Sequence, residues 1–292
     1  MIKNMFRKGL VFGIIALFIG AGIIPSTVGI KKEKTTNTFL KSGGYIQGLI
    51  DNASDGDIIY IPNGTYYENI VINKSISLIG ENKNTTIIDG SGSGTVVHIS
   101  ADWINISGFN ICNAISGVHI SSKWNCISSN IITNNDYGIS FGSCYGNIIK
   151  ENIIFKNKYG LELWIFCSSH NITNNNISNN RYGIFLEGST SNNINSNIIS
   201  NNIFGIYLKY RYFWQNFFNA AENNIIKNNF IHNIRNACFI HSFTGGSFFN
   251  IWQENYWGKT LTSLKLIFGR IFLFPWINID WHPAKEPYDI EV

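Results

Sequence analysis

The chain has 292 residues, of which 45% are hydrophobic and 14% are charged, and its formal net charge is +4. Charged residues are well below the usual quarter, so Asn, Ser and Thr supply most of the polar surface. The regular spacing of Ile, Leu and Val excludes a disordered polar tract, and so small a net charge gives no reason to expect a nucleic-acid partner.

The first 30 residues have the pattern of an export signal. Three basic residues precede an uncharged apolar run over 10–24, and small residues follow it. This run has the length of a signal-peptide core and is short for a membrane span, which needs about 20 residues. We predict a signal peptide or N-terminal anchor over 1–30, with any anchoring by residues 9–25. The membrane would be contacted only there, and the rest of the chain would be secreted, periplasmic or at the cell surface.

Residues 31–44 are predicted to be a linker, because they start with charged residues and continue with Thr, Asn and Gly. Beyond it, Ile46, Leu49 and Ile50 follow helical spacing. We predict one short helix that covers the open end of the following structure and shields its first strand edge. Apolar runs separated by turn pairs follow from Ile58 and indicate short strands.

The centre of the chain repeats with a period of about 22 residues. One arm is an aromatic-Gly-apolar triplet, with steps of 22, 23 and 22 residues between Gly138, Gly160, Gly183 and Gly205. A second arm begins at Asn130, Asn152, Asn175 and Asn197, and a third arm begins at Asn147, Asn171 and Asn193. Three short apolar arms per period predict a solenoid, in which each coil buries its apolar face against its neighbours.

The predicted solenoid domain spans 45–254, and the aromatic segment 255–292 is predicted to form a C-terminal cap or tail. One coil carries an insertion of about ten residues, over 210–218, which we expect to form a protruding loop. Asn pairs such as Asn134-Asn135 recur at one corner of successive coils. Asn tolerates the left-handed backbone of a sharp corner, and stacked amides can form hydrogen-bonded ladders. These Asn residues are therefore predicted to maintain the fold.

The five cysteines are widely spaced and form no Cys-x-x-Cys motif, so they carry no zinc or thioredoxin-like signature. Cys144 and Cys167 lie one repeat apart, at nearly equivalent positions. Neighbouring coils are about 4.8 Å apart, which permits a disulfide. A disulfide and a pair of small buried thiols both remain open.

The segment from Ile46 to Gly90 resembles the opening of right-handed parallel β-helix proteins, through Gly56-Asp57-Ile58, Gly64-Thr65-Tyr66 and Thr86-Ile87-Ile88-Asp89-Gly90. The Asn-rich Tyr-Gly-Ile coils extend the likeness to about residue 258. The chain is most similar to the NosD-like family, also called periplasmic copper-binding β-helix proteins, within the pectin-lyase-like group of carbohydrate-binding and sugar-hydrolysing proteins. This resemblance implies an all-β, right-handed parallel β-helix and a role in delivering copper to an extracytoplasmic reductase. The residues themselves predict no cofactor, because the only methionines, Met1 and Met5, lie in the export signal.

In the strand after each repeat glycine, the first and third residues are apolar and are predicted to point inward, so the second faces solvent. These second positions form a column of His98, His119, Ser140, Glu162, Phe185, Tyr207 and Phe239. A parallel column at the fourth position contains Trp164, Glu187 and Lys209. We predict a ligand-binding face, on which Trp164, Phe185, Tyr207 and Phe239 stack on sugar rings beside Lys209. Alternatively, the insertion or the tail covers these rings.

Two further sites are candidates on this face. His98 and His119 could hold a divalent metal with Glu162, although a catalytic zinc normally has three protein ligands and two imidazoles are an incomplete set; surface histidines without a metal are the alternative. Glu162 and Glu187 are candidates for the acid and base of a glycoside hydrolase, with backbones about 8 Å apart, nearer to inverting geometry.

The preferred prediction is a non-catalytic, extracytoplasmic binding module for a polysaccharide, another glycan or a cell-surface protein. One alternative is a carbohydrate-active hydrolase or lyase that acts on this face. The other is an accessory protein for copper delivery, as the family resemblance implies.

Overall fold

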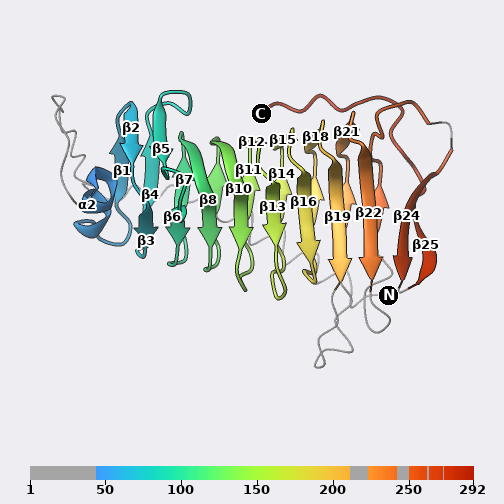
Figure 1. The fold of residues 1–292 in the computed structure, drawn as a ribbon, viewed down its shortest axis with the longest axis horizontal. Helices are drawn as coiled ribbons and strands as arrows, with labels where there is room; N and C mark the ends of the chain where they lie inside the picture. Colours follow the sequence, from blue (N-terminus) through green and yellow to red (C-terminus); the bar gives the residue numbers. More distant parts are fainter. Residues whose placement is uncertain (1–43, 211–222, 242–249, 262, 272) are drawn as a thin grey trace, which may run out of the picture. The chain divides into compact units, whose positions relative to one another are not determined.

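The computed structural model describes residues 44–210, 223–241, 250–261, 263–271 and 273–292. The predicted export signal, most of the predicted linker and nearly all of the predicted insertion lie outside these residues. The chain divides into two units, 1–37 and 38–292, and the second contains every described residue. It is a parallel β-helix with one short helix, α2 (Tyr45–Asp51). The predicted fold class is confirmed (Figure 1).

Each coil contributes strands to three stacks. The first stack contains β1 (Ile58–Ile61), β4 (Ser77–Gly80), β7 (Asn105–Ser107), β9 (Cys126–Ser128), β11 (Ile148–Lys150), β14 (Asn171–Thr173), β17 (Asn193–Asn195), β20 (Asn224–Ile226) and β23 (Ile251–Gln253). The second contains β2 (Gly64–Tyr67), β5 (Thr86–Asp89), β12 (Ile153–Phe155), β15 (Asn176–Ser178), β18 (Ile198–Ser200) and β21 (Asn229–Ile231).

The third stack has longer strands, which point downward in Figure 1. It contains β3 (Ile70–Ile72), β6 (Thr95–Ile99), β13 (Tyr159–Leu163), β16 (Tyr182–Glu187), β19 (Phe204–Tyr210), β22 (Arg235–His241) and β24 (Lys265–Ile271). Two strands, β8 (Asn110–Ile120) and β10 (Ile131–Phe141), run through the corner and belong to both the second and third stacks. Successive strands in all three stacks pair in parallel, for example Ile139 with Leu161 and Leu161 with Ile184.

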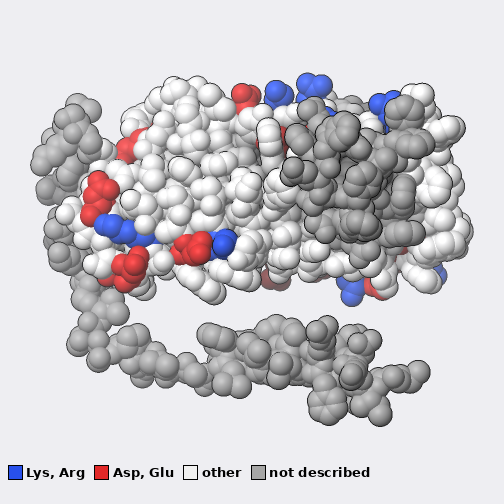
Figure 2. Space-filling view, turned by 90° about the horizontal axis from the view of Figure 1, so that it is seen from below, with Lys and Arg blue, Asp and Glu red and all other residues white. Residues whose placement is uncertain are grey.

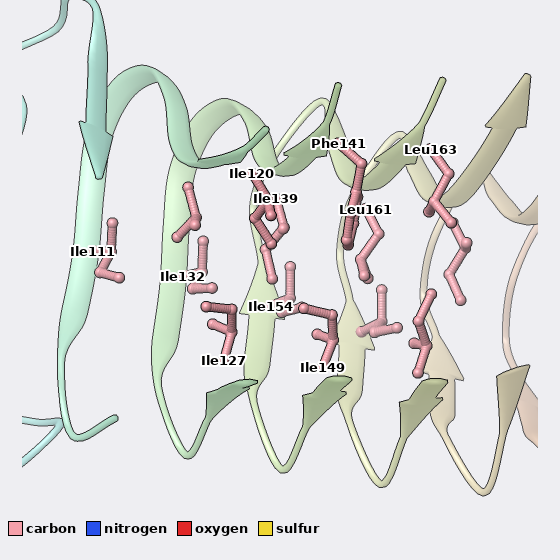
Figure 3. Packing of buried hydrophobic residues seen from close by; sticks show 14 of the residues in the cluster. Ile111, Ile120, Ile127, Ile132, Ile139, Phe141, Ile149, Ile154, Leu161 and Leu163 are labelled. Carbon is pink, nitrogen blue, oxygen red and sulfur yellow. The ribbon is translucent and has the colours of Figure 1, made fainter. Parts of the chain in front are cut away.

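The core lies inside the coils, because alternate strand residues point inward. Ile120, Phe141, Leu163 and Leu186 occupy equivalent positions on consecutive coils and are buried. Figure 3 shows several of these residues pointing into the interior, toward Ile132, Ile154 and others from the opposite strands. Each inward residue thus packs on its equivalents above and below, as a solenoid requires.

Asn side chains form ladders at three corners. In each ladder the amide oxygen accepts the backbone N–H of the equivalent Asn one coil earlier, at 2.8–3.2 Å. The predicted Asn corner is confirmed, since Asn135, Asn180 and Asn202 lie in one of these ladders. Residues before ladder positions adopt left-handed backbone, as at Asn134 (φ 57°), Asn179 (φ 56°) and Asn201 (φ 54°). The amides satisfy backbone groups that the tight corners would otherwise leave unpaired.

The third arm predicted from the sequence treats Asn147 and Asn171 as equivalent, but the structure shifts this match by one residue. Ile148 pairs with Asn171, which pairs with Asn193, so the ladder residues one position earlier are Asn147, His170 and Asn192. His170 stands where other coils have Asn, and its Nδ1 accepts the N–H of Asn147 at 3.1 Å. The predicted arm begins at Asn in every coil, so it did not include His170, whose imidazole replaces the ladder amide in this coil.

The two ends of the coil stack are closed differently. At the first end, the Glu68 carboxylate accepts the N–H groups of Ile46 and Gln47, and the Gln47 side chain bonds both backbone groups of Val71 in β3. Helix α2 therefore covers the strand edge, as predicted. At the other end, β24 pairs in parallel with β22 and antiparallel with β25 (Phe274–Asp280), so the tail forms a hairpin.

Candidate functional site

The predicted outward column exists, with one correction. His98, His119, Ser140, Glu162, Phe185 and Tyr207 are register partners on consecutive coils. The next member is Cys238, whereas Phe239 pairs with Leu208 and lies in the core, 0% exposed. Placing Phe239 in the column requires a step of 32 residues from Tyr207, but the step across the inserted segment is 31 residues, because Gly205 lies against Asn236 and Tyr207 pairs with Cys238. Phe239 is therefore wrong as an exposed platform.

Outward direction does not make this column accessible. Phe185 is 6% exposed and Glu162 is 5% exposed, whereas Tyr207 and Lys209 are partly exposed. A second outward column packs against it, formed by near-parallel stacked rings 4.9–5.2 Å apart: Tyr137, Tyr159, Tyr182 and Phe204. Phe185 and Tyr207 stack on one another at 5.5 Å and meet Tyr182 edge-on. Much of their ring surface is therefore used in packing, which favours a structural role.

The Glu162 carboxyl has unusual electrostatics. Its burial raises its pKa to about 7, the nearby Glu187 also raises it, and a Trp164 hydrogen bond and Lys158 lower it. Such a pKa suits a general acid, but little of the carboxyl is open to a substrate. Glu187 ends β16 and pairs in register with Lys209.

The two predicted metal-binding histidines lie together. Their ring centroids are 5.4 Å apart, and one nitrogen of each ring has a hydroxyl neighbour: His98 Nε2 with Ser121 at 3.1 Å and His119 Nδ1 with Ser140 at 2.9 Å. Burial and His98 lower the pKa of His119. Among the described residues, Glu162 does not join them in a cluster of three ligand atoms.

A different cluster of possible metal ligands is present. Within the described parts of the chain, the three-residue group with ligand atoms within 4.8 Å of one another is Cys144, Cys167 and His170, all buried. All five cysteines are free. The sequence paired the two cysteines, but it missed the imidazole because of the one-residue alignment error at that corner.

The most exposed stacked aromatic residues lie at the turns that follow the long strands. Trp103 and Trp124 are 65% and 45% exposed, and their rings stack at 5.8 Å. Tyr145 meets Trp124 edge-on at 5.4 Å, and its register partner Ser168 belongs to the next turn, which also exposes Trp164 and Phe166. We call Trp103, Trp124, Tyr145, Trp164 and Phe166 the aromatic corner.

The backbone of the aromatic corner has the left-handed geometry that the other coils adopt before their ladder positions. Trp103 and Trp124 have φ angles of 62° and 59°, a left-handed conformation that is rare for bulky residues. The next coil has Gly146 at the following equivalent position, and a Cβ there would meet the Trp124 ring at 2.5 Å.

Polar groups accompany these rings. Asp102 accepts the Lys123 backbone N–H at 2.8 Å, and Lys123 Nζ lies 4.6 Å from the Tyr145 ring centroid. Figure 2 views the side where the turns after the long strands lie, and on its left half acidic and basic side chains lie next to one another.

A cleft of about 670 Å³ lies near the C-terminal end. It forms where β22 and β24 separate, because these strands pair only over Phe239–His241 and Gly269–Ile271. Its lining includes Arg235, Lys265 and Arg270 beside Tyr207 and Phe268. The sequence candidates Tyr207 and Phe239 thus border a cleft that the repeat pattern did not predict.

Comparisons with known proteins agree with the fold. A family model described as periplasmic copper-binding protein (NosD) matches residues 50–272. A cell surface glycoprotein of Methanothermus fervidus is 28% identical over 197 residues, which cover 55% of this chain and 32% of the glycoprotein. The chain thus spans about a third of that relative's length.

Solved structures are similar in fold at low sequence identity. ORF18 of Geobacillus virus E2 has a TM-score of 0.50 and 15% identity, over 77% of this chain and 57% of that chain. The alginate lyase of Paenibacillus sp. str. FPU-7 has a TM-score of 0.47 and 14% identity, over 69% and 91%. The likeness to ORF18 shows the fold alone. Among the described residues, no helix is long and apolar enough to cross a membrane.

Proposed function

The chain belongs to the family of periplasmic copper-binding proteins (NosD), and from this premise we propose that it acts outside the cytoplasm as a non-catalytic module that binds polysaccharide along the aromatic corner. The family name and the cell surface glycoprotein relative support the location. The exposed Trp103–Trp124 stack supports the binding mode.

Ring chemistry favours a sugar ligand for the aromatic corner. The apolar C–H face of a hexose stacks on an indole ring, and large exposed aromatic surface usually marks an interaction site. The corner spans turns of four coils, or about 14 Å at 4.8 Å per coil, which is longer than one sugar ring. Asp102 and Lys123 lie beside it and supply the hydrogen bonds that orient a ligand.

The near-burial of Glu162 favours binding over hydrolysis in this proposal. A general acid must come within hydrogen-bond reach of the bond that it protonates, and this carboxyl is 5% exposed. Trp164 remains a proposed binding residue, now as part of the aromatic corner. Phe185, Tyr207 and Lys209 are secondary candidates, because their column is largely packed.

The first test replaces the two tryptophans with the residue that the next coil carries. The double variant Trp103→Gly/Trp124→Gly relieves left-handed strain of about 1–2 kcal/mol per residue, against about 0.5–1.5 kcal/mol of lost stacking. We expect the thermal melt to stay within a few degrees while retention on a polysaccharide array disappears. The matched control is Tyr60→Ala/Tyr67→Ala, which removes two exposed rings elsewhere and should leave retention unchanged. Full retention by the tryptophan variant would contradict the proposal.

A further inference from the structure

The hairpin at the end of the coil stack exposes many large apolar side chains. Its strands β24 and β25 lie at the right-hand end in Figure 1 and pair antiparallel. Phe268 and Phe274 are each 64% exposed and Leu273 is 74% exposed, and Trp276 and Ile277 are also exposed. We call these five residues the apolar hairpin surface. Contiguous apolar surface of this kind marks a contact with another protein or with a membrane.

The register of the hairpin explains why both of its faces are apolar near the turn. On one face, Phe268 lies opposite Ile277. The other face is buried at the far end of β25, where Asp280 is fully covered. Side chains alternate along a strand, so this second face continues from Asp280 toward the turn through Trp276 and Phe274, which are exposed. The apolar hairpin surface therefore extends past the area that the coils cover.

The segment that forms the hairpin is basic. Between Glu254 and Asp280 the chain carries Lys259, Lys265 and Arg270 and no acidic residue. Burial and then the like charge of Lys259 lower the pKa of Lys265. The ion pairs among the described residues join other side chains, so none of them neutralises these three cations. An anionic surface would therefore complement the charge beside the apolar hairpin surface.

We propose that the apolar hairpin surface inserts into the interfacial layer of a membrane that contains anionic lipids, while Lys265 and Arg270 face the lipid headgroups. Binding of this kind depends on the apolar area buried and on the attraction between basic residues and anionic lipids. Aromatic side chains are enriched at this depth of a bilayer. The contact is additional to the one predicted for residues 1–30 and is separate from sugar binding at the aromatic corner.

The backbone of the hairpin fits an interfacial position and not a membrane span. Away from β24, β25 pairs with β23 only between Asp280 and Trp252, so most of that strand edge has no strand partner among the described residues. Unpaired backbone groups are not tolerated in hydrocarbon, but water reaches them at the level of the headgroups. The apolar side chains can therefore enter the acyl boundary while the strand edge stays hydrated.

A second copy of the chain is the main alternative occupant, and charge disfavours a symmetric dimer through this surface. Two hairpins that met across a twofold axis would bring the same cations together. Neither copy has an acidic residue between Glu254 and Asp280 to pair with them, and Asp280 is itself buried and bonded to Asn255. Anionic lipid headgroups supply the negative charge that a second hairpin lacks.

The test places an environment-sensitive fluorophore at one of two sites in the full chain. Leu273→Cys carries it on the hairpin, and the matched control Tyr67→Cys carries it in the first coils, at a similar exposed fraction of 72%. The five native cysteines are common to both proteins. On vesicles of phosphatidylglycerol and phosphatidylcholine, we expect a blue shift and quenching by spin-labelled headgroups for the hairpin label only. Because this readout is local, it does not depend on whether residues 1–30 also bind the vesicles.

Further variants in the Leu273→Cys protein separate the apolar contribution from the charge. Phe274→Ser should lower the ratio of inserted to free hairpin about 10-fold. Lys265→Gln/Arg270→Gln should lower it about 5-fold per cation on anionic vesicles and leave it unchanged on vesicles of phosphatidylcholine alone. The tryptophan variant of the aromatic corner should insert as the parent does.

Three results would overturn the proposal. The first is a hairpin label that keeps its aqueous emission on anionic vesicles, and the second is an equal shift of both labels. The third is a blue shift without lipid together with a doubled mass in light scattering, which would assign the apolar hairpin surface to a second copy of the chain.

Discussion

At the ladder positions, each coil places a hydrogen-bond acceptor for the backbone of the coil before it, even where the residue is not Asn. An amide presents one acceptor to the coil before it and donors to its own surroundings, and His170 reproduces the acceptor with Nδ1. At the last coil, Asp280 from β25 takes the place of the next Asn. Its carboxylate accepts the Asn255 N–H and amide at 3.0 and 3.2 Å, so the ladder ends on an acceptor that needs no further coil.

Asp280 should be the most sensitive ladder position. It is fully buried and also accepts N–H groups of Glu254, Trp257 and His282. Asp280→Ala leaves these donors unpaired, and we expect a loss of about 3–5 kcal/mol in the free energy of unfolding, measured by denaturant melts. Asp280→Asn should lose less, because one oxygen still accepts from Asn255 and Trp257. Equal losses in both variants would contradict this account.

Glu162 should make stability depend on pH. Its pKa is raised from 4.5 to about 7 by burial, so the folded state keeps the proton at pH values where the unfolded state has released it. The resulting stability is complete below about pH 4.5 and is lost as pH rises through 7. We expect the melting temperature of the wild type to fall more between pH 5 and 8 than that of Glu162→Gln, which mimics the neutral acid. Parallel pH profiles would show that the carboxyl ionises as freely in the fold as in the unfolded chain.

At the scale of the strand, the repeat glycines explain why the aromatic-Gly-apolar triplet was so regular. In β13, a Cβ on Gly160 would meet the Gly183 carbonyl oxygen at 2.5 Å, and Gly138 meets Gly160 in the same way. The glycine therefore allows backbones of adjacent coils to approach, and the preceding Tyr rings then stack at 4.9–5.2 Å. The sequence showed the spacing, and the structure supplies its steric cause.

Gly160→Ala should push β13 and β16 apart and destabilise the protein by about 1–3 kcal/mol. The control is Gly48→Ala in α2, where an added Cβ meets nothing within 4 Å. There, the better helix propensity of Ala should stabilise by up to about 1 kcal/mol. Chemical denaturation of both variants measures the contrast, and a neutral Gly160→Ala would show that the coils can shift without cost.

For the whole molecule, much of the architecture could be predicted because successive coils need the same residue types at equivalent positions. The period, the inward columns and the Asn corners follow from spacing, and the register from His98 to Tyr207 was correct. Prediction failed where a coil departs from the repeat. Phe239 was misplaced because the inserted segment hides the true 31-residue step from Gly205 to Asn236. Apart from Trp164, the residues of the aromatic corner were missed, because turn residues have no alternation from which exposure can be predicted.

A core substitution in one coil should also destabilise the neighbouring coils. Ile184 is fully buried and packs between equivalent residues on two neighbouring coils, Leu161 and Ile206. Ile184→Asp buries an unpaired charge, and we expect a loss above about 4 kcal/mol, whereas Ile184→Val should lose about 0.5–1.5 kcal/mol. Amide hydrogen exchange should show lost protection on both sides of the altered coil. Exchange limited to β16 would mean that coils are stabilised independently.

The hydrogen-bond distance between successive ladder residues does not depend on the number of residues in the coil between them. His170 N lies 3.1 Å from Asn192 Oδ1 across 22 residues, and Asn192 N lies 3.1 Å from Asn223 Oδ1 across 31 residues. A coil that is nine residues longer than its neighbour thus keeps the same ladder hydrogen bond. Two ladder residues can therefore be joined by chains of different length while the contact between them stays the same.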